Sequence, residues 1–245
     1  MSVAYSEALS LKGKTVVITG GAHGLGLLLA DVLAEAGAFI AVLDIGIPKK
    51  GFIQALATKH TVQVKYYKTD VINRKEVSDV IEVIFTLPNS FSININSAGV
   101  VIEQSFLEAD DRNLATTFDV NFRELSSSLS LAQRLCTYAQ KITCYTATKA
   151  ALGGLYRPMA MELAQYGITS NSLSPGSMRT DTFREVEKSF PDLVKQFNQQ
   201  CMFGRVGNPE ELEPAILFLD STRCTMGQDL LVDGGISSWK HRGNW

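Results

Sequence analysis

The sequence has few residues of the kinds that hold metals or build disulfide scaffolds. Its 245 residues include only three histidines, His23, His60 and His241, and these are far apart. The four cysteines show no C-x-x-C spacing. We therefore expect no protein-bound metal and four reduced thiols, the usual state in the cytoplasm.

Other absences narrow the function classes. No run of about 18 apolar residues occurs, so we expect no membrane-spanning helix. The formal net charge of -2 gives no electrostatic case for binding nucleic acid or an anionic membrane. Residues 1–14 lack an apolar stretch after a basic start, so we expect no secretory signal. These features favour a cytoplasmic protein that acts on a small molecule.

The first half of the chain alternates short apolar runs with helical patterns. This alternation is typical of βαβ units and a parallel sheet. Strands are expected at 14–19, 39–44, 62–70 and 92–97, and helices at 25–36 and 77–84. Without repeats, low-complexity tracts or linker-like stretches, residues 1–245 are predicted to form a single α/β domain, a doubly wound parallel sheet flanked by helices.

The second half is less regular. Helices are expected at 110–121, 145–166 and 209–220, and strands at 168–174 and 229–233. The third of these helices contains Pro214, which should distort or delay it. The stretch from Thr180 to Met202 is expected to form a lid over the substrate. Its mixture of Phe183, Phe190, Phe197 and charged residues does not define a ligand.

A glycine-rich turn, Thr19–Gly26, lies between the first strand and the first helix. Glycine allows the backbone to turn sharply and approach a pyrophosphate, toward which the next helix directs its free N–H groups. Asp44 closes the second strand 18 residues after Gly26 (44 − 26). A carboxylate there can accept the ribose hydroxyls of NAD and repel the 2′-phosphate of NADP. The pattern favours NAD, while the nearby Lys49 and Lys50 keep NADP as the alternative.

Tyr145 and Lys149 stand four residues apart on a predicted helix, so both side chains can address one pocket. A free phenol titrates near pH ~10, and a neighbouring cation lowers that value. The pair therefore suits a tyrosine that acts as general acid or base. Such pairs also occur by chance on solvated helices, so the remaining motifs must support this interpretation.

Taken together, the motifs resemble the short-chain dehydrogenase/reductase family in order and spacing across nearly the full chain. The matching pieces are Thr19–Gly26, Asp70-Val71, Asn96–Gly99, Asn121, Tyr145–Lys149, Pro175-Gly176 with Thr180, and Val232–Gly235. The resemblance implies a Rossmann-like domain and a hydride transfer between NAD(P) and a secondary alcohol or ketone. A narrower resemblance, to fungal polyol and ketose reductases, rests on 175–180, Gly204-Arg205 and 233–239.

The resemblance also implies roles for individual residues. Tyr145 would exchange the proton, Lys149 would assist it and hold the nicotinamide ribose, and Asn121 would anchor a water in a proton relay. The other residues implied in cofactor binding are Gly20, His23, Gly24, Leu25, Gly26, Asp44, Asp70, Val71, Asn96, Ala98, Gly99, Pro175, Gly176, Met178 and Thr180.

One segment departs from the family pattern. Only 24 positions separate Asn121 from Tyr145 (145 − 121), and a helix, a strand and a serine loop must share them. In one interpretation, 125–130 is a reduced fifth strand and Ser130 polarises the substrate carbonyl, with Ser128 as the reserve. In the other, 122–135 is helical, and the strand and serine are missing. A parallel sheet without an internal strand leaves buried backbone groups unpaired, which favours the first interpretation.

Two functions follow. The leading hypothesis is an oxidoreductase that uses NAD or NADP, with a polyol or ketose among its possible substrates. The rival is a catalytically impaired dinucleotide-binding protein, because the serine lies in the shortened segment.

In the family, the helix after Asn121 and the Tyr145 helix pack against a second subunit. The resemblance therefore implies a homodimer or homotetramer, and the shortening weakens that expectation.

Overall fold

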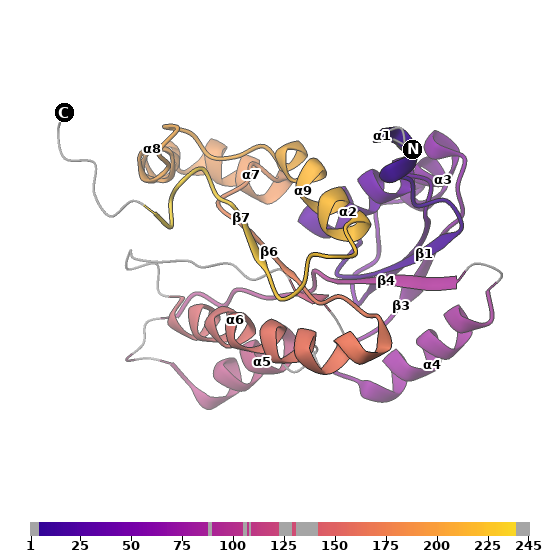
Figure 1. Ribbon diagram of the computed structural model, residues 1–245. Coiled ribbons are helices and arrows are strands. Elements are labelled where there is room, and N and C mark those ends of the chain that lie inside the picture. Colours follow the sequence, from indigo (N-terminus) through magenta and orange to yellow (C-terminus); the bar gives the residue numbers. More distant parts are fainter. Residues whose placement is uncertain are drawn as a thin grey trace.

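The computed structural model describes residues 5–87, 90–104, 107, 109–122, 129–130 and 142–238 (Figure 1). Its strands are β1 (Lys14–Thr19), β2 (Phe39–Asp44), β3 (Val64–Lys68), β4 (Ser90–Asn96), β5 (Leu129–Ser130), β6 (Ser172–Pro175) and β7 (Asp229–Val232). Its helices are α1 (Tyr5–Ala8), α2 (Gly24–Glu35), α3 (Phe52–His60), α4 (Arg74–Phe85), α5 (Asp111–Asn121), α6 (Thr143–Leu163), α7 (Asp181–Ser189), α8 (Pro191–Gln200) and α9 (Glu213–Ser221).

All strand pairs in the described chain are parallel. Five strands form one sheet in the order β3-β2-β1-β4-β5, and β6 pairs with β7 in a second. Helices α2, α3 and α9 cover one face, and α4, α5 and α6 cover the other (Figure 1). The architecture is the predicted doubly wound α/β fold, and the order reverses at β1, where β2 and β4 leave in opposite directions. Such a switch point opens a crevice at the carboxyl ends of the strands.

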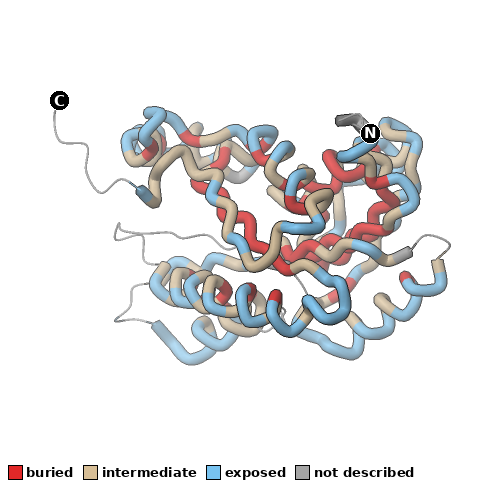
Figure 2. Tube along the Cα trace, viewed as in Figure 1, coloured by how far each residue is buried: buried red, intermediate tan, exposed pale blue. Residues whose placement is uncertain are grey.

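The core forms because β1 and β2 are nearly continuous apolar runs. Every residue of β2 is buried, as are five of the six in β1. Leu29 and Leu33 of α2 pack in one core cluster with residues of these two strands and have no exposed surface. Figure 2 shows the buried residues concentrated along these strands. Central parallel strands, covered by helices on both faces, require this composition.

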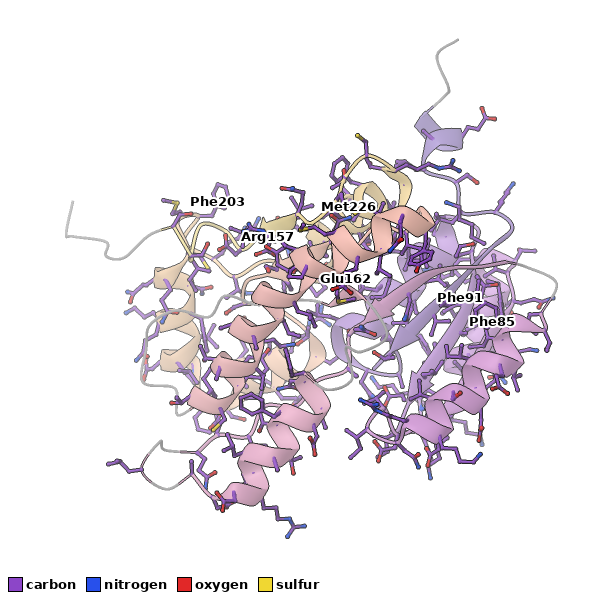
Figure 3. All side chains as sticks on the ribbon, turned by 60° about the horizontal axis from the view of Figure 1, so that its bottom comes forward. Phe85, Phe91, Arg157, Glu162, Phe203 and Met226 are labelled. Carbon is purple, nitrogen blue, oxygen red and sulfur yellow. The ribbon has the colours of Figure 1, made fainter. Side chains whose placement is uncertain are left out.

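The opposite face is closed partly by α4. Asn73 caps this helix, since its side chain accepts hydrogen bonds from the backbone N–H groups of Lys75 and Glu76. Ile84 is fully buried against the sheet. The rings of Phe85 and Phe91 meet edge to face at 5.3 Å, joining the end of α4 to the start of β4 (Figure 3).

The structure can be compared with the sequence-based expectation element by element. The fifth strand is described at Leu129–Ser130, inside the predicted 125–130, and residues 125–128 lie outside the described residues. The predicted helix 209–220 is divided into a 3₁₀ turn, Pro209–Leu212, and α9, because Pro214 fits only in a first helical turn. Helices α1, α3, α7 and α8 were not predicted. No helix among the described residues is long and apolar enough to cross a membrane.

Candidate active site

The glycine-rich turn leads directly from β1 into α2. Gly20 lies in the turn, His23 is the N-cap residue, and Gly24, Leu25 and Gly26 form the first helical turn. A Cβ on Gly26 would collide with the backbone carbonyl oxygen of Gly20. Gly24 has a φ of +56°, and a Cβ there would meet nothing within 4 Å. The turn is therefore tightly packed beneath, while Gly24 leaves open space at a helix N-terminus, which suits a phosphate group.

Asp44, the last residue of β2, stands beside this turn. Its carboxylate accepts hydrogen bonds from the backbone N–H groups of Ala22, at 3.0 Å, and Gly46, at 2.8 Å. The Nδ1 atom of His23 lies 3.8 Å from Asp44 Oδ2. The Tyr66 hydroxyl donates to the carbonyl of Gly46 at 2.9 Å and steadies the loop. This fixed carboxylate retains lone pairs for ribose hydroxyls, so the residues present fit a dinucleotide.

Helix α6 brings Tyr145 and Lys149 onto one face as predicted. The Lys149 Nζ atom lies 5.5 Å from the centroid of the Tyr145 ring. Tyr145 is only 8% exposed, and burial raises the pKa of its phenol to about 12. Desolvation of the phenolate is the cause of this rise, and the lowering of the pKa by Lys149 stays a prediction.

Asn121, at the end of α5, connects α6 to the loop after β4. Asn121 is 2% exposed; its Oδ1 accepts from the Val100 N–H at 2.7 Å and its Nδ2 donates to the Val100 carbonyl at 2.9 Å. The same Nδ2 donates to Thr148 Oγ1 at 3.3 Å. A Cβ on Gly99 would lie 3.2 Å from Asn121 Oδ1 and 3.8 Å from Lys149 Nζ. Asn121, Gly99 and Lys149 thus meet at one point.

The other predicted cofactor residues follow strand ends. Asn96 ends β4, and the Ala98 N–H donates to Thr19 Oγ1 at 3.3 Å, which joins the turns after β4 and β1.

Asp70 and Val71 follow β3, where Asp70 Oδ1 accepts from the Ile72 N–H. Pro175 ends β6, the Gly176 N–H donates to the Val232 carbonyl, and Met178 is 7% exposed. Thr180 caps α7, accepting from the Phe183 N–H at 3.4 Å.

The two candidate serines are only partly placed. Ser130 is the last residue of β5, paired with Asn96 of β4, and its side chain lies outside what the structure describes. Ser128 lies outside the described residues altogether. The strand pairing supports the strand interpretation at 129–130. It leaves the role of either hydroxyl a prediction.

Thr148 was missed by sequence reasoning. It is fully buried, and its hydroxyl donates to the Tyr145 carbonyl at 2.7 Å while accepting from Asn121. Its place directly before Lys149 was visible in the sequence, but its partner is 27 residues away on another helix. Only the tertiary structure reveals that contact.

The match to known proteins covers nearly the whole chain. A family model described as "short chain dehydrogenase" matches residues 14–137, and one described as "Enoyl-(Acyl carrier protein) reductase" matches 127–237. The sorbose reductase of Schizosaccharomyces pombe is 31% identical over 258 residues, covering 95% of this chain and 99% of that protein. The chain belongs to the short-chain dehydrogenase/reductase family.

Two further relatives illustrate the range within the family. A probable NADP-dependent mannitol dehydrogenase of Yarrowia lipolytica is 30% identical, over 94% of this chain and 89% of that protein. The crystal structure of a putative gluconate dehydrogenase from Agrobacterium tumefaciens is 25% identical with a TM-score of 0.85, covering 95% of this chain and 99% of that one. This short-chain dehydrogenase/reductase is accordingly an NAD(P)-dependent oxidoreductase that interconverts an alcohol and a ketone. The comparisons do not favour the rival hypothesis of an impaired binding protein.

The comparison with the sorbose reductase bears on the length of the chain. Its alignment spans 258 residues, whereas this chain has 245 in all. At least 13 aligned positions (258 − 245) therefore have no counterpart here. The chain is therefore shorter than this relative within the matched region.

Proposed function

We propose that this short-chain dehydrogenase/reductase reduces a ketose to the corresponding polyol, with NADH preferred over NADPH. The observation that carries the proposal is the position of Lys149, which meets Asn121 at Gly99 after β4 and also lies beside the Tyr145 ring. The sorbose reductase and mannitol dehydrogenase relatives support the substrate class.

The protonation state of Tyr145 favours the reductive direction. Because burial raises the pKa of the phenol to about 12, Tyr145 carries its proton at neutral pH. A protonated phenol can donate to the oxygen of a ketone as that oxygen gains negative charge. The bound nicotinamide cofactor supplies the hydride that reaches the carbonyl carbon. Lys149 would hold the ribose next to the nicotinamide.

Asn121 would serve the proton path through its backbone. Its side-chain amide is already committed to Val100 and Thr148. Its backbone carbonyl stands at the end of α5, where helical carbonyls lack an intrahelical partner. A water held there would return a proton to Tyr145 from solvent. Ser130, at the end of β5, would orient the substrate carbonyl.

The preference for NADH rests on Asp44. Its carboxylate is held by two backbone N–H groups and would accept the ribose hydroxyls. The 2′-phosphate of NADPH would bring negative charge to the same carboxylate. NADPH remains the alternative, given the NADP-dependent relative.

The test is the rate of NADH and NADPH oxidation with a panel of ketoses, diketones and ketosteroids. We expect ketose turnover that Tyr145→Phe reduces by at least about 100-fold, the lower range for loss of a general acid. Tyr156→Phe is the matched control, because Tyr156 is also a buried tyrosine of α6 with a cation, Arg157, over its ring. Unchanged turnover in Tyr145→Phe would refute the catalytic assignment.

The cofactor preference has its own variant. Asp44→Asn keeps the shape of the side chain and removes the charge, so the ratio of kcat/KM for NADH to that for NADPH should fall. A wild-type protein with a clear preference for NADPH would contradict the assignment of NADH.

A further inference from the structure

The loops that follow β2 and β6 stand far apart along the carboxyl edge of the strands. β1 and β4 separate β2 from β5, and β5 contacts β6. Neighbouring paired strands lie about 4.8 Å apart, so the three steps from β2 to β5 span about 14 Å, and β6 lies beyond β5. The loop after β2 follows Asp44, and the segment after β6 leads through Thr180 into α7. A dinucleotide that reaches from Asp44 to Lys149 must lie in the interval between them.

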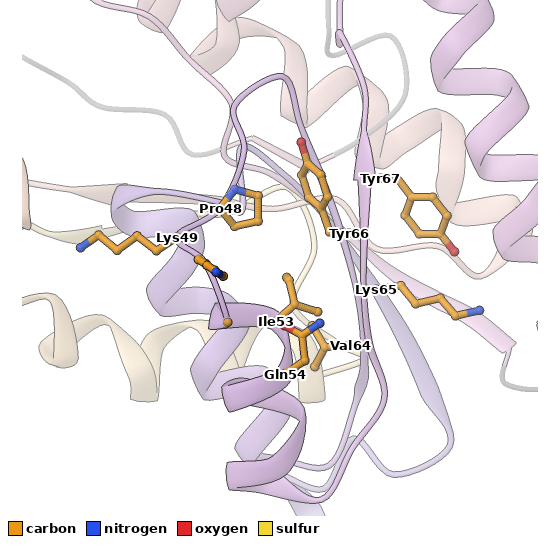
Figure 4. Close-up of a pocket in the computed structure, with 10 residues that line it drawn as sticks. Pro48, Lys49, Ile53, Gln54, Val64, Lys65, Tyr66 and Tyr67 are labelled. Atoms are coloured by element: carbon orange, nitrogen blue, oxygen red, sulfur yellow. The ribbon is translucent and has the colours of Figure 1, made fainter.

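An ion pair nevertheless joins these two loops. The Lys49 Nζ atom lies 3.4 Å from Asp181 Oδ2, although 132 residues separate them in the chain. Lys49 points away from Tyr66 and out of the pocket shown in Figure 4. Asp181 is the first residue of α7, and Arg184, one turn later, also contacts its carboxylate at 3.1 Å. The pair therefore attaches the first turn of the predicted lid to the adenosine side of the groove.

Side-chain contacts connect α7 to α8 within the predicted lid, 180–202. Thr180 caps the N-terminus of α7, and Phe183 of α7 meets Phe197 of α8 edge to face at 5.7 Å. Arg179, just before the helix, pairs with Glu187 at 2.8 Å. A tether at Asp181 is thus transmitted along α7 and into α8 by direct contacts.

We propose that Lys49 and Asp181 form a latch across the dinucleotide groove, as positioning residues that hold the lid closed and slow release of the cofactor. This inference rests on the proposed function, because it assigns the groove to a nicotinamide dinucleotide. Both side chains are largely exposed, at 79% and 73%. An exposed ion pair is weak and screened by salt, so the latch opens readily and changes a release rate rather than the fold.

The experiment measures NADH dissociation from the full chain by stopped-flow, as the change in NADH fluorescence when excess non-fluorescent NAD displaces the bound NADH. Lys49→Gln and Asp181→Asn should each raise the dissociation rate by about two- to five-fold, the range expected for one exposed ion pair. The double variant should be no faster than the faster single variant, because each change removes the same contact. Lys49→Arg keeps the charge and should retain the wild-type rate. Salt near 0.5 M should accelerate release from the wild type and have little effect on the double variant.

The matched control is Lys75→Gln. Lys75 and Asp79 form another exposed lysine–aspartate pair, at 2.6 Å, on α4 on the opposite face of the sheet. Its loss should leave the NADH release rate unchanged. An equal acceleration in Lys75→Gln would show a general effect of charge and overturn the latch.

A second measurement works without cofactor. Hydrogen–deuterium exchange of the peptide covering 181–189 should be faster in Lys49→Gln than in wild type, and unchanged in Lys75→Gln. If exchange responds but NADH release does not, the ion pair exists and the latch is refuted. If Lys49→Gln speeds release while Asp181→Asn slows it or leaves it unchanged, Lys49 contacts the cofactor directly and the latch is again refuted. A wild type that binds neither NADH nor NADPH would refute the proposed function instead, whatever the exchange shows.

Discussion

The side-chain amide of Asn121 donates to the Thr148 hydroxyl at 3.3 Å, and this contact joins the end of α5 to the helix that carries Tyr145 and Lys149. The same amide holds the N–H and the carbonyl of Val100. Three segments distant in sequence are thereby fixed by one buried side chain. The position of the proposed acid depends on this network as well as on the Tyr145 helix.

Thr148 tests that dependence. Thr148→Val keeps the shape of the side chain and removes both hydroxyl contacts, which should destabilise the protein by about 1–3 kcal/mol because buried partners lose hydrogen bonds. We expect kcat to fall about tenfold with little change in KM. Thr148→Ser retains the hydroxyl and should restore most of kcat. Thermal unfolding and steady-state kinetics check these outcomes; equal kcat values for Val and Ser would contradict a positioning role.

The buried phenol of Tyr145 predicts an unusual titration. Burial raises its pKa to about 12, so Tyr145 in the cofactor-free protein should ionise well above pH 10. The difference in phenolate absorbance between wild type and Tyr145→Phe isolates this group. In the reductive direction, kcat/KM should not fall between pH 7 and about 10 through loss of the Tyr145 proton, since this profile reports the free enzyme. A tyrosine limb near pH 8 would contradict the effect of burial.

Two glycines should respond in opposite ways to alanine. Gly26→Ala forces a Cβ onto the backbone carbonyl oxygen of Gly20, so we expect a loss of more than about 2 kcal/mol of stability and weaker NADH binding. Gly154 lies inside α6, and a Cβ there meets nothing within 4 Å. Gly154→Ala should instead stabilise by about 0.5–1 kcal/mol. Urea denaturation of both variants gives the two free energies directly.

Asp220, near the end of α9, should make stability depend on pH. Its Oδ2 atom is buried with no hydrogen-bond partner among the described residues, and burial raises the pKa of the carboxyl to about 7. The folded-state pKa lies above the unfolded value, so this contribution to stability is complete below about pH 4 and is lost as pH rises through 7. At about 1.4 kcal/mol per pKa unit, the total is at most about 4 kcal/mol.

Asp220→Asn removes the ionisation and should be more stable than wild type at pH 8. It should lose the part of the pH dependence between pH 4 and 8 that Asp220 contributes. Thermal melts at several pH values in this range provide the comparison. An Asn variant with the wild-type pH profile would show that Asp220 is not the group responsible.

Local sequence patterns predicted the fold where burial dominates. β1 and β2 begin and end at the predicted residues because both contain short buried apolar runs between glycine-containing turns. Helix α3 was missed because its sequence, FIQALATKH, buries only Leu56 and so presents a weak apolar stripe. The helix predicted at 209–220 begins later because Pro214 restricts where α-helical hydrogen bonding can start.

For the site, sequence predicted the chemical groups and missed their connections. Tyr145, Lys149 and Asp44 could be named from motifs whose spacing is local. The bond from Asn121 to Thr148 and the ion pair from Lys49 to Asp181 join residues 27 and 132 positions apart, and no periodicity encodes such contacts. The rise in the pKa of Tyr145 depends on how completely neighbouring elements exclude water, which the sequence does not state.

Within the described chain, β6 and β7 form a sheet that is not hydrogen-bonded to the other five strands. The groups proposed for the adenosine half follow β2, and those for the nicotinamide half follow β6. A bound dinucleotide would therefore hold the two sheets together from outside the backbone and raise the stability of both. The cofactor-free protein would then be the form that proteases degrade first, so the cellular supply of NADH would govern how long the enzyme survives as well as how fast it works.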